Sequence, residues 1–151
     1  MAKNYRPSPA FRVANTFVGA LLRRGIRLGE NVLLTVPGRT SGQPRTTPVT
    51  ILKWGSERFL QSPFGEVDWV RNLRAAGRGT LTRGRRVEEV AVVELSPAEA
   101  APVYQGTLAS FPAPVRARFG VAPGAPLAAF EEEARHHPMF RLVRPSTAAG
   151  R

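Results

Sequence analysis

The sequence predicts a mainly β protein of the α+β class, an antiparallel barrel or sheet with an N-terminal helix and peripheral helices. Short apolar segments follow one another through the middle of the chain, and turns rich in Gly and Pro join them. Strand and helix do not alternate in the way that builds a doubly wound nucleotide-binding sheet. No internal repeat or long linker divides the chain, so we expect one domain over residues 1–151, loose at 1–9 and 145–151.

Composition supports a folded protein and excludes several classes of function. Hydrophobic residues make up 42% of the 151 residues, which is enough for a core. The chain has no Cys, which excludes disulfides and thiolate metal sites and favours a cytoplasmic location. Its two histidines, His136 and His137, are adjacent and cannot share a helix face, so we expect no metal site.

The chain is strongly basic, with a net charge of +11 from 22 basic and 11 acidic residues. Such a surface attracts nucleic acid, anionic membranes or acidic small molecules. The basic residues are scattered, without the clustered face and recognition helix or aromatic platform of a nucleic-acid binder. We therefore expect a small-molecule partner and no nucleic acid, with charge-driven binding to nucleic acid or anionic membrane as the alternative.

The first long element is a predicted amphipathic helix over Phe11–Leu28, packed on the domain. Its helically spaced apolar residues are Ala14, Phe17, Val18, Leu21 and Leu22. The apolar stretch is far shorter than the roughly 20 residues that a membrane span needs. Peripheral contact with a membrane surface through the basic flank of this helix is the alternative.

A hairpin and a third strand follow. Val32–Val36 is an apolar strand, which Pro37 and Gly38 interrupt. Arg45–Leu52 forms the second arm of the hairpin, and Arg58–Gln61 forms the next strand after a turn.

The middle of the chain combines a short helix with a second hairpin. Asp68 is the expected N-cap of a helix over Trp69–Ala76. Thr80–Thr82 and Arg85–Leu95 are the arms of the hairpin. The alternation of apolar and polar residues slips near Glu88–Glu89, which predicts a bulge there.

Helices and one strand complete the chain. Ser96, followed three residues later by Glu99, predicts a capping box that starts a helix running to about Ala109. A further helix is expected over Leu127–His137, and Met139–Val143 is the candidate final strand. The residues of that helix expected to face inward are Leu127, Phe130 and Ala134.

The tip of the first hairpin has the composition of an anion site. Arg39 and Arg45 lie on either side of the tip, and a guanidinium makes forked contacts with phosphate or carboxylate. Glycines there let backbone N–H groups approach an anion. The tip and the strand after it also supply hydroxyl groups, from Thr40, Ser41, Thr46 and Thr47. The alternative is an ordinary hairpin with solvated arginines.

The chain lacks the motifs of a self-sufficient enzyme, including a nucleophile elbow, a Walker loop and an HExxH sequence. A short protein with few acid–base groups still catalyses a reaction when a cofactor carries the chemistry. The hairpin arginines would then hold the cofactor's phosphate, and Ser62–Gly65 with Trp69 and Asn72 would meet its ring. Trp69 as an ordinary core residue is the alternative.

Three strings resemble the deazaflavin-dependent nitroreductase family: LLTVPGRTSGQPRTTP, SPFGEVDWVRNLRAAG and HPMFRLV. The likeness is close over Val32–Leu81, where the G-R-x-S-G-x-P-R-x-T-P string precedes W-x-x-N-L-R. The resemblance implies a split β-barrel of the FMN-binding type that uses coenzyme F420, with FMN as the less favoured cofactor.

The resemblance also assigns cofactor-binding roles to matching positions. Those holding the phosphate and tail are Arg39, Thr40, Ser41, Gly42 and Arg45. Those beneath the ring system are Thr46, Thr47, Pro48, Val49 and Thr50. Those closing the other side are Ser62, Pro63, Phe64, Gly65, Trp69, Val70, Arg71, Asn72 and Leu73. The family commonly has Lys where this chain has Thr40, and Arg71 or Arg74 is the candidate replacement for that charge.

The function implied is transfer of a hydride from reduced coenzyme F420 to an electron-poor small molecule such as an enone, quinone or nitro compound. Ser62, Tyr104 and water are the alternatives for the proton that must follow, and no catalytic residue is assigned. A flavin- or haem-binding barrel without turnover is the alternative function. Analogy with other barrels of this architecture suggests a homodimer.

Overall fold

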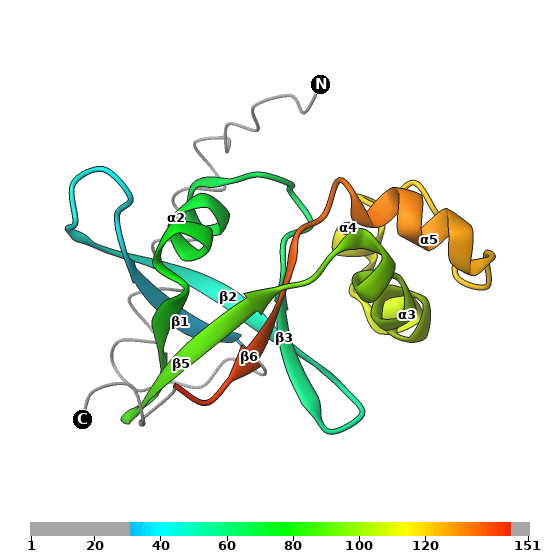
Figure 1. Cartoon of the computed structure of the whole chain (residues 1–151). Helices are drawn as coiled ribbons and strands as arrows, with labels where there is room; N and C mark the ends of the chain where they lie inside the picture. The colour runs from blue at the N-terminus through cyan, green and yellow to red at the C-terminus, as the bar shows by residue number, and fades with distance from the viewer. Residues whose placement is uncertain (1–30, 146–151) are drawn as a thin grey trace.

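The computed structural model describes residues 31–145, which form a closed antiparallel barrel with helices at one end and one side (Figure 1). The helix expected over 11–28, and the membrane contact expected from it, lie outside the described residues. The strands are β1 (Asn31–Pro37), β2 (Pro44–Trp54), β3 (Glu57–Gln61), β4 (Arg78–Arg83), β5 (Arg86–Glu94) and β6 (Met139–Val143). Their order around the barrel is β1-β2-β3-β6-β5-β4, which confirms the predicted fold class.

Side chains at alternate positions of the strands point inward and fill the barrel. Val32, Leu34 and Val36 of β1 are at most 1% exposed and face inward. The other strands contribute Val49, Ile51, Leu60, Leu81, Val90, Phe140 and Leu142. Helix α2 (Asp68–Ala76) lies across one end of the barrel and buries Val70 and Leu73 in the same core (Figure 1). The helix is therefore part of the barrel's packing and does not lie on its surface.

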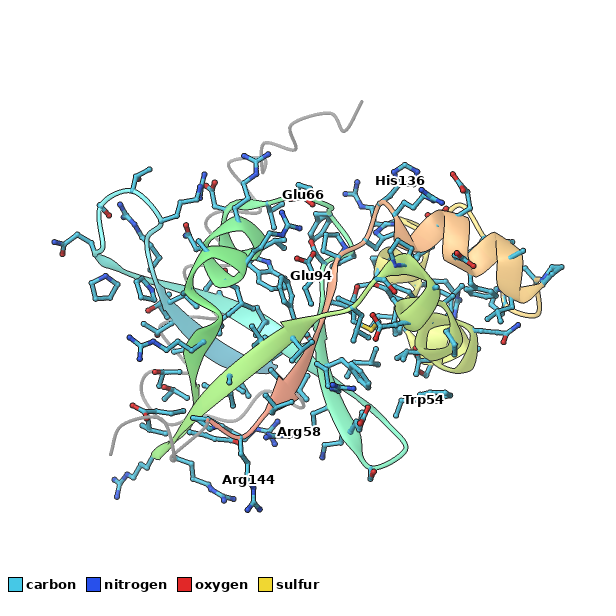
Figure 2. All side chains as sticks on the ribbon, viewed as in Figure 1. Trp54, Arg58, Glu66, Glu94, His136 and Arg144 are labelled. Carbon is cyan, nitrogen blue, oxygen red and sulfur yellow. The ribbon has the colours of Figure 1, made fainter. Side chains whose placement is uncertain are left out.

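The bulge expected near Glu88–Glu89 is absent. The β4–β5 ladder runs without interruption from Arg78↔Ala91 to Arg83↔Arg86. Glu88 keeps its place in the ladder because its carboxylate accepts two hydrogen bonds from Arg58, at 3.0 and 2.6 Å. The irregular pattern in the sequence reflects an ion pair between strands, not an inserted residue. Arg58 lies at the end of the barrel away from α2 (Figure 2).

The remaining helices form a group beside β3 and β6 (Figure 1). They are α3 (Pro97–Thr107), the 3-10 turn η1 (Leu108–Ser110), α4 (Ala113–Arg116) and α5 (Leu127–Ala134). Phe59 and Met139, on the outer side of the barrel, pack with this group into a second core. The capping box is confirmed, since Ser96 Oγ accepts from Glu99 N at 3.2 Å and Glu99 Oε1 accepts from Ser96 N at 3.0 Å. Among residues 31–145, no helix is long and apolar enough to cross a membrane.

Three local predictions about helices α2 and α5 are wrong. Val67, not Asp68, is the N-cap of α2, and no side chain caps that end, because the Asp68 carboxylate turns toward Arg39. Helix α5 ends at Ala134, three residues before the predicted end at His137. Leu127 is 45% exposed, because the first turn of α5 extends past the core that buries Phe130.

Candidate functional site

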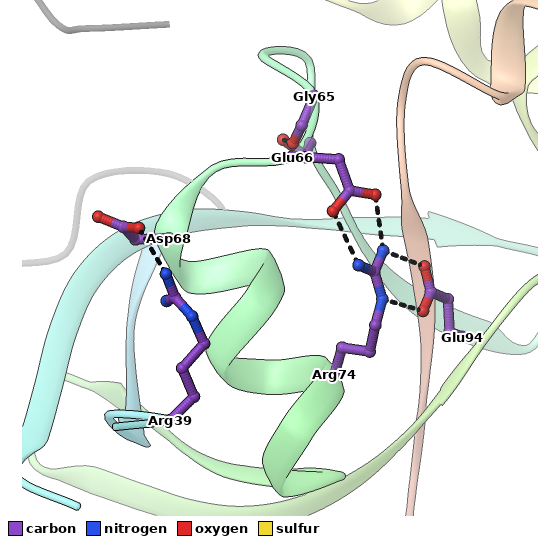
Figure 3. Close-up of polar contacts among 7 residues, drawn as sticks. Arg39, Gly65, Glu66, Asp68, Arg74 and Glu94 are labelled. Carbon is purple, nitrogen blue, oxygen red and sulfur yellow. Dashed lines mark hydrogen bonds and ion pairs between the residues drawn. The ribbon is translucent and has the colours of Figure 1, made fainter. Parts of the chain in front are cut away.

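Arg39 connects the tip of the β1–β2 hairpin to α2 through the Asn72 amide and the Asp68 carboxylate. Asn72 Oδ1 accepts hydrogen bonds from the backbone N–H of Arg39 at 3.1 Å and from Arg39 Nη1 at 2.9 Å. Asn72 itself is 5% exposed. Arg39 Nη2 also reaches Asp68 Oδ1 at 3.4 Å (Figure 3). The structure therefore brings together hairpin and helix residues that are distant in the sequence but were assigned to one site.

Arg45, the second hairpin arginine, is exposed, and no described residue accepts a hydrogen bond from its guanidinium. It lies close to Gly38, where an added Cβ would stand 3.5 Å from Arg45 Nε and 2.9 Å from Ser41 Oγ. The absence of a side chain at Gly38 thus lets a guanidinium and a hydroxyl converge at the tip. This cradle suits an anionic group such as a phosphate.

Hydrogen bonds between backbone groups within the tip hold its shape. Gly38 N donates to Gln43 O at 2.8 Å, and Gly42 N donates to Gly38 O at 2.9 Å. Gly42 has φ of 70°, in the left-handed region that Gly adopts without strain. Ser41 Oγ accepts from Gln43 N at 3.2 Å, so the hydroxyl hydrogen is still available to a ligand.

The threonine-rich start of β2 is divided between two faces. Arg45, Thr47 and Val49 stand opposite Val36, Leu34 and Val32, the inward residues of β1. The outer face carries Thr46, whose Oγ1 lies 2.9 Å from Thr35 Oγ1, together with Pro48 and Thr50. These positions thus cannot all face one ligand.

Three of the predicted site residues are core residues of the barrel. Val49, Val70 and Leu73 are 9%, 0% and 0% exposed and pack in the barrel core. Trp69 is partly buried against the same core, with its ring centre 6.2 Å from that of Phe140. Their part in cofactor binding stays a prediction.

The loop Ser62–Gly65 is folded on itself. Ser62 is 0% exposed, and its hydroxyl donates to Gly65 O at 2.6 Å. Its backbone N–H donates to Pro138 O at 3.0 Å, and the Arg118 guanidinium lies 5.0 Å from the centre of the Phe64 ring. Gly65 has φ of 81°, which Gly alone adopts readily. The loop is therefore held from the side of the helical group.

Arg74 is committed to two carboxylates and cannot supply the charge absent at Thr40. Its guanidinium donates to Glu66 at 2.8 Å and to Glu94 at 2.7 and 2.8 Å, with two bonds to each carboxylate (Figure 3). These hydrogen bonds raise the pKa of Arg74. Of the two candidate replacements, Arg71 is exposed and makes no hydrogen bond with a described residue.

Sequence reasoning missed Gln61. Its Oε1 is buried and is the side-chain oxygen without a hydrogen-bond partner among the described residues. Gln61 is the last residue of β3 and directly precedes the loop Ser62–Gly65, so this oxygen lies next to the predicted site in the chain. Apart from the position of Gln61 just before the loop, nothing in the sequence indicated that its side-chain oxygen would be buried without a partner.

Both side chains considered as proton donors are turned inward. The Ser62 hydroxyl donates to Gly65 O, and the Tyr104 hydroxyl donates to His137 O at 2.8 Å. Tyr104 is 1% exposed, and its burial raises its pKa.

Comparisons with known proteins agree with this architecture. A pyridoxamine 5′-phosphate oxidase-related, FMN binding protein from Nostoc punctiforme is 13% identical with a TM-score of 0.56, over 93% of this chain and 82% of its own. A structure described as a domain-swapped dimer is 17% identical with a TM-score of 0.54, over 90% and 100%. An F420-H2 dependent reductase, FDR-A, is 16% identical with a TM-score of 0.51, over 76% and 94%. At these identities the likeness shows the shared split-barrel fold.

No curated protein matches the sequence. The model of one family, F420H(2)-dependent quinone reductase, matches residues 10–118, which is more than half of the chain and includes the hairpin tip, the loop Ser62–Gly65 and α2. The chain therefore belongs to the F420H(2)-dependent quinone reductase family, and it is an oxidoreductase that uses coenzyme F420.

Proposed function

We propose that this protein reduces an electron-poor small molecule, such as an enone, quinone or nitro compound, with coenzyme F420 bound at the hairpin tip, the loop Ser62–Gly65 and α2. The observation that carries the proposal is the Arg45 guanidinium, which no described residue engages, next to the Ser41 hydroxyl at Gly38. An anionic group bound there would complete the contacts of both side chains.

The two hairpin arginines would then have different tasks. Arg39 fixes the tip through Asn72, so little conformational freedom is lost when a ligand binds. Arg45 and Ser41 would hold the phosphate, and Arg71 would add positive charge from α2. Of the other sequence-predicted positions, those on one face of β2, those of the loop and those of α2 stay in the proposal as neighbours of the ring.

When bound, the reduced deazaflavin supplies the hydride. The protein's share is to orient the acceptor and to exclude water from it. Water is the proposed proton source, because the hydroxyl groups of Ser62 and Tyr104 already donate to backbone carbonyls. A homodimer stays a prediction.

Arg45→Ala tests the proposal by fluorescence titration with oxidised coenzyme F420. We expect about 10-fold or greater loss of affinity, the effect of removing a charged hydrogen-bonding group from an anion. Arg85→Ala is the matched control, since Arg85 is exposed in the β4–β5 turn and also engages no described residue. Unchanged affinity in Arg45→Ala would remove the hairpin from the site. Equal losses in both variants would favour binding through bulk charge.

A further inference from the structure

A buried histidine joins the helical group to the loop Ser62–Gly65. His137 is 5% exposed, and its Nδ1 lies 3.2 Å from Ser62 O while its Nε2 lies 2.9 Å from Glu133 Oε1. Its ring stacks on Phe119, with ring centres 4.0 Å apart and planes inclined by 25°. The imidazole is therefore fixed in orientation between a carbonyl oxygen and a carboxylate.

Both partners of this ring are hydrogen-bond acceptors. A backbone carbonyl never donates, and an ionised carboxylate accepts only. Partial burial raises the pKa of Glu133, but hydrogen bonds from Gly120 N–H and His137 outweigh burial and hold that pKa below its usual value. Glu133 is thus ionised at neutral pH. Two acceptors require N–H groups on both ring nitrogens, which the imidazolium alone provides.

The neutral ring satisfies one partner only. Glu133 Oε1 also accepts from Gly120 N at 2.8 Å, and a charge-assisted bond is stronger than a bond to a neutral carbonyl. The single N–H of the neutral ring would therefore stay with Glu133, and the contact with Ser62 O would be lost.

Other titratable or charged groups near the ring come from neighbouring elements. Tyr104 of α3 lies edge-on to it, with ring centres 6.4 Å apart, and donates to the His137 carbonyl. His136 is exposed at the junction of α5 and β6 (Figure 2). Arg118 lies over Phe64, beside the loop. Among the charged groups of the described residues near the ring, it is the Glu133 carboxylate that contacts the imidazole directly.

The segment of residues 136–138, which contains His137, meets the loop Ser62–Gly65 at two further points. Ser62 N donates to Pro138 O at 3.0 Å. A Cβ added to Gly65 would stand 3.4 Å from His136 O, so loop and segment are in van der Waals contact. The ring contact is therefore one of three points at which this segment meets the loop.

We propose that His137 is a positioning residue: as the imidazolium paired with Glu133, it binds the Ser62 carbonyl and holds the loop Ser62–Gly65 in its ligand-ready shape. Deprotonation releases the loop, so the affinity for coenzyme F420 falls as the pH rises. This inference rests on the proposed function in placing the loop beside the cofactor.

Hydrogen exchange of the Ser62 amide tests the contact without any ligand. Between about pH 5.5 and about pH 8.5 we expect the wild-type protection factor to fall roughly three- to tenfold. His137→Gln should show the low value at every pH. Glu133→Gln removes the charged partner of the ring and should also lower the protection factor. A wild-type protection factor that does not vary with pH overturns the proposal even if no variant folds.

The matched control is His136→Gln, which changes an exposed neighbouring imidazole whose side chain makes no hydrogen bond with a described residue and acts on Glu133 through its charge alone. It should retain the wild-type profile. A change as large as that of His137→Gln would show that the segment responds to any substitution and would end the claim for this ring.

Titration with coenzyme F420 then connects the contact to binding. The ratio of dissociation constants, His137→Gln over wild type, cancels the cofactor's own ionisation. We expect a ratio of roughly three to ten at low pH that approaches one at high pH, where the wild type has also lost the contact. A ratio that stays constant overturns the inference. If neither protein binds coenzyme F420, the proposed function fails, while the exchange data still decide the role of His137.

Discussion

At the scale of single residues, Asn72 decides the shape of the candidate site. The sequence suggested that Asn72 and Arg39 both face a ligand, but in the structure they face each other. One amide oxygen accepts from both the backbone and the side chain of Arg39, so it determines where the hairpin tip lies relative to α2. Of the two hairpin arginines, Arg45 is thus the one that no described residue engages.

Asn72→Ala should lower the free energy of unfolding by about 1–3 kcal/mol, because it leaves the Arg39 backbone N–H without its partner in a partly buried position. Urea denaturation followed by circular dichroism measures the change. Arg71→Ala, at an exposed neighbouring position on α2, is the control and should stay close to wild type. Equal stability of Asn72→Ala and wild type would mean that water replaces the amide at no cost.

At the scale of elements, α2 is fixed to the barrel by apolar burial and by Arg74. Val70 and Leu73 enter the barrel core, while Arg74 joins Glu66, before the helix, to Glu94 at the end of β5. Figure 2 shows Glu66 and Glu94 close together on the α2 side of the barrel. The hydrogen bond from Arg74 lowers the pKa of Glu66. A carboxyl group with a lowered pKa stabilises the fold above its unfolded pKa, and this contribution disappears as the pH falls through the folded value.

Arg74→Met should therefore destabilise the protein at neutral pH and cease to do so in acid. The three side chains are 32–41% exposed, so solvent screening limits the expected loss to about 1–2 kcal/mol. Urea denaturation at neutral pH and at steps below 4.5, the ordinary pKa of Glu66, measures the difference. Arg71→Met on the same helix is the comparison: Arg71 lowers the pKa of Glu66 by its charge without a hydrogen bond, so a smaller effect of the same sign is expected. A difference between Arg74→Met and wild type that persists unchanged in acid would show that packing of the arginine stem, not its charge, supplies the stability.

At the scale of the whole molecule, the barrel closes where β1 pairs with β4. Gly79 lies at this seam, and a Cβ there would stand 3.0 Å from both Leu34 Cδ1 and Val36 Cγ1 and 3.2 Å from Thr35 O. The two strands meet closely because this position has no side chain. Residues more than 40 positions apart in the chain are thus brought into one core.

Gly79→Ala should destabilise the barrel by about 1–3 kcal/mol, the usual cost of overpacking a core, despite the lower backbone entropy that Ala gives the unfolded chain. The midpoint of chemical denaturation measures it, with Thr80→Ala, the next residue along β4, as the control. A gain in stability for Gly79→Ala would show that the seam can open to admit the methyl group.

Local sequence patterns were enough to predict the strands, α2, the capping box and the family. These depend on alternation, turn residues and short strings, which are properties of neighbours in the chain. The hairpin was also identified as the anion site, and that assignment remains a prediction. Leu127, Asp68 and the supposed bulge were misplaced because their surroundings come from distant segments.

The three-dimensional fold was needed to show which of the two hairpin arginines is engaged by described residues, and to show the link between His137 and Ser62. Arg39 and Asn72 are 33 positions apart, and His137 and Ser62 are 75 apart. Such contacts form when barrel closure brings remote segments together, and local residue order does not record which polar groups will then meet. The division of roles between the two hairpin arginines follows from that closure.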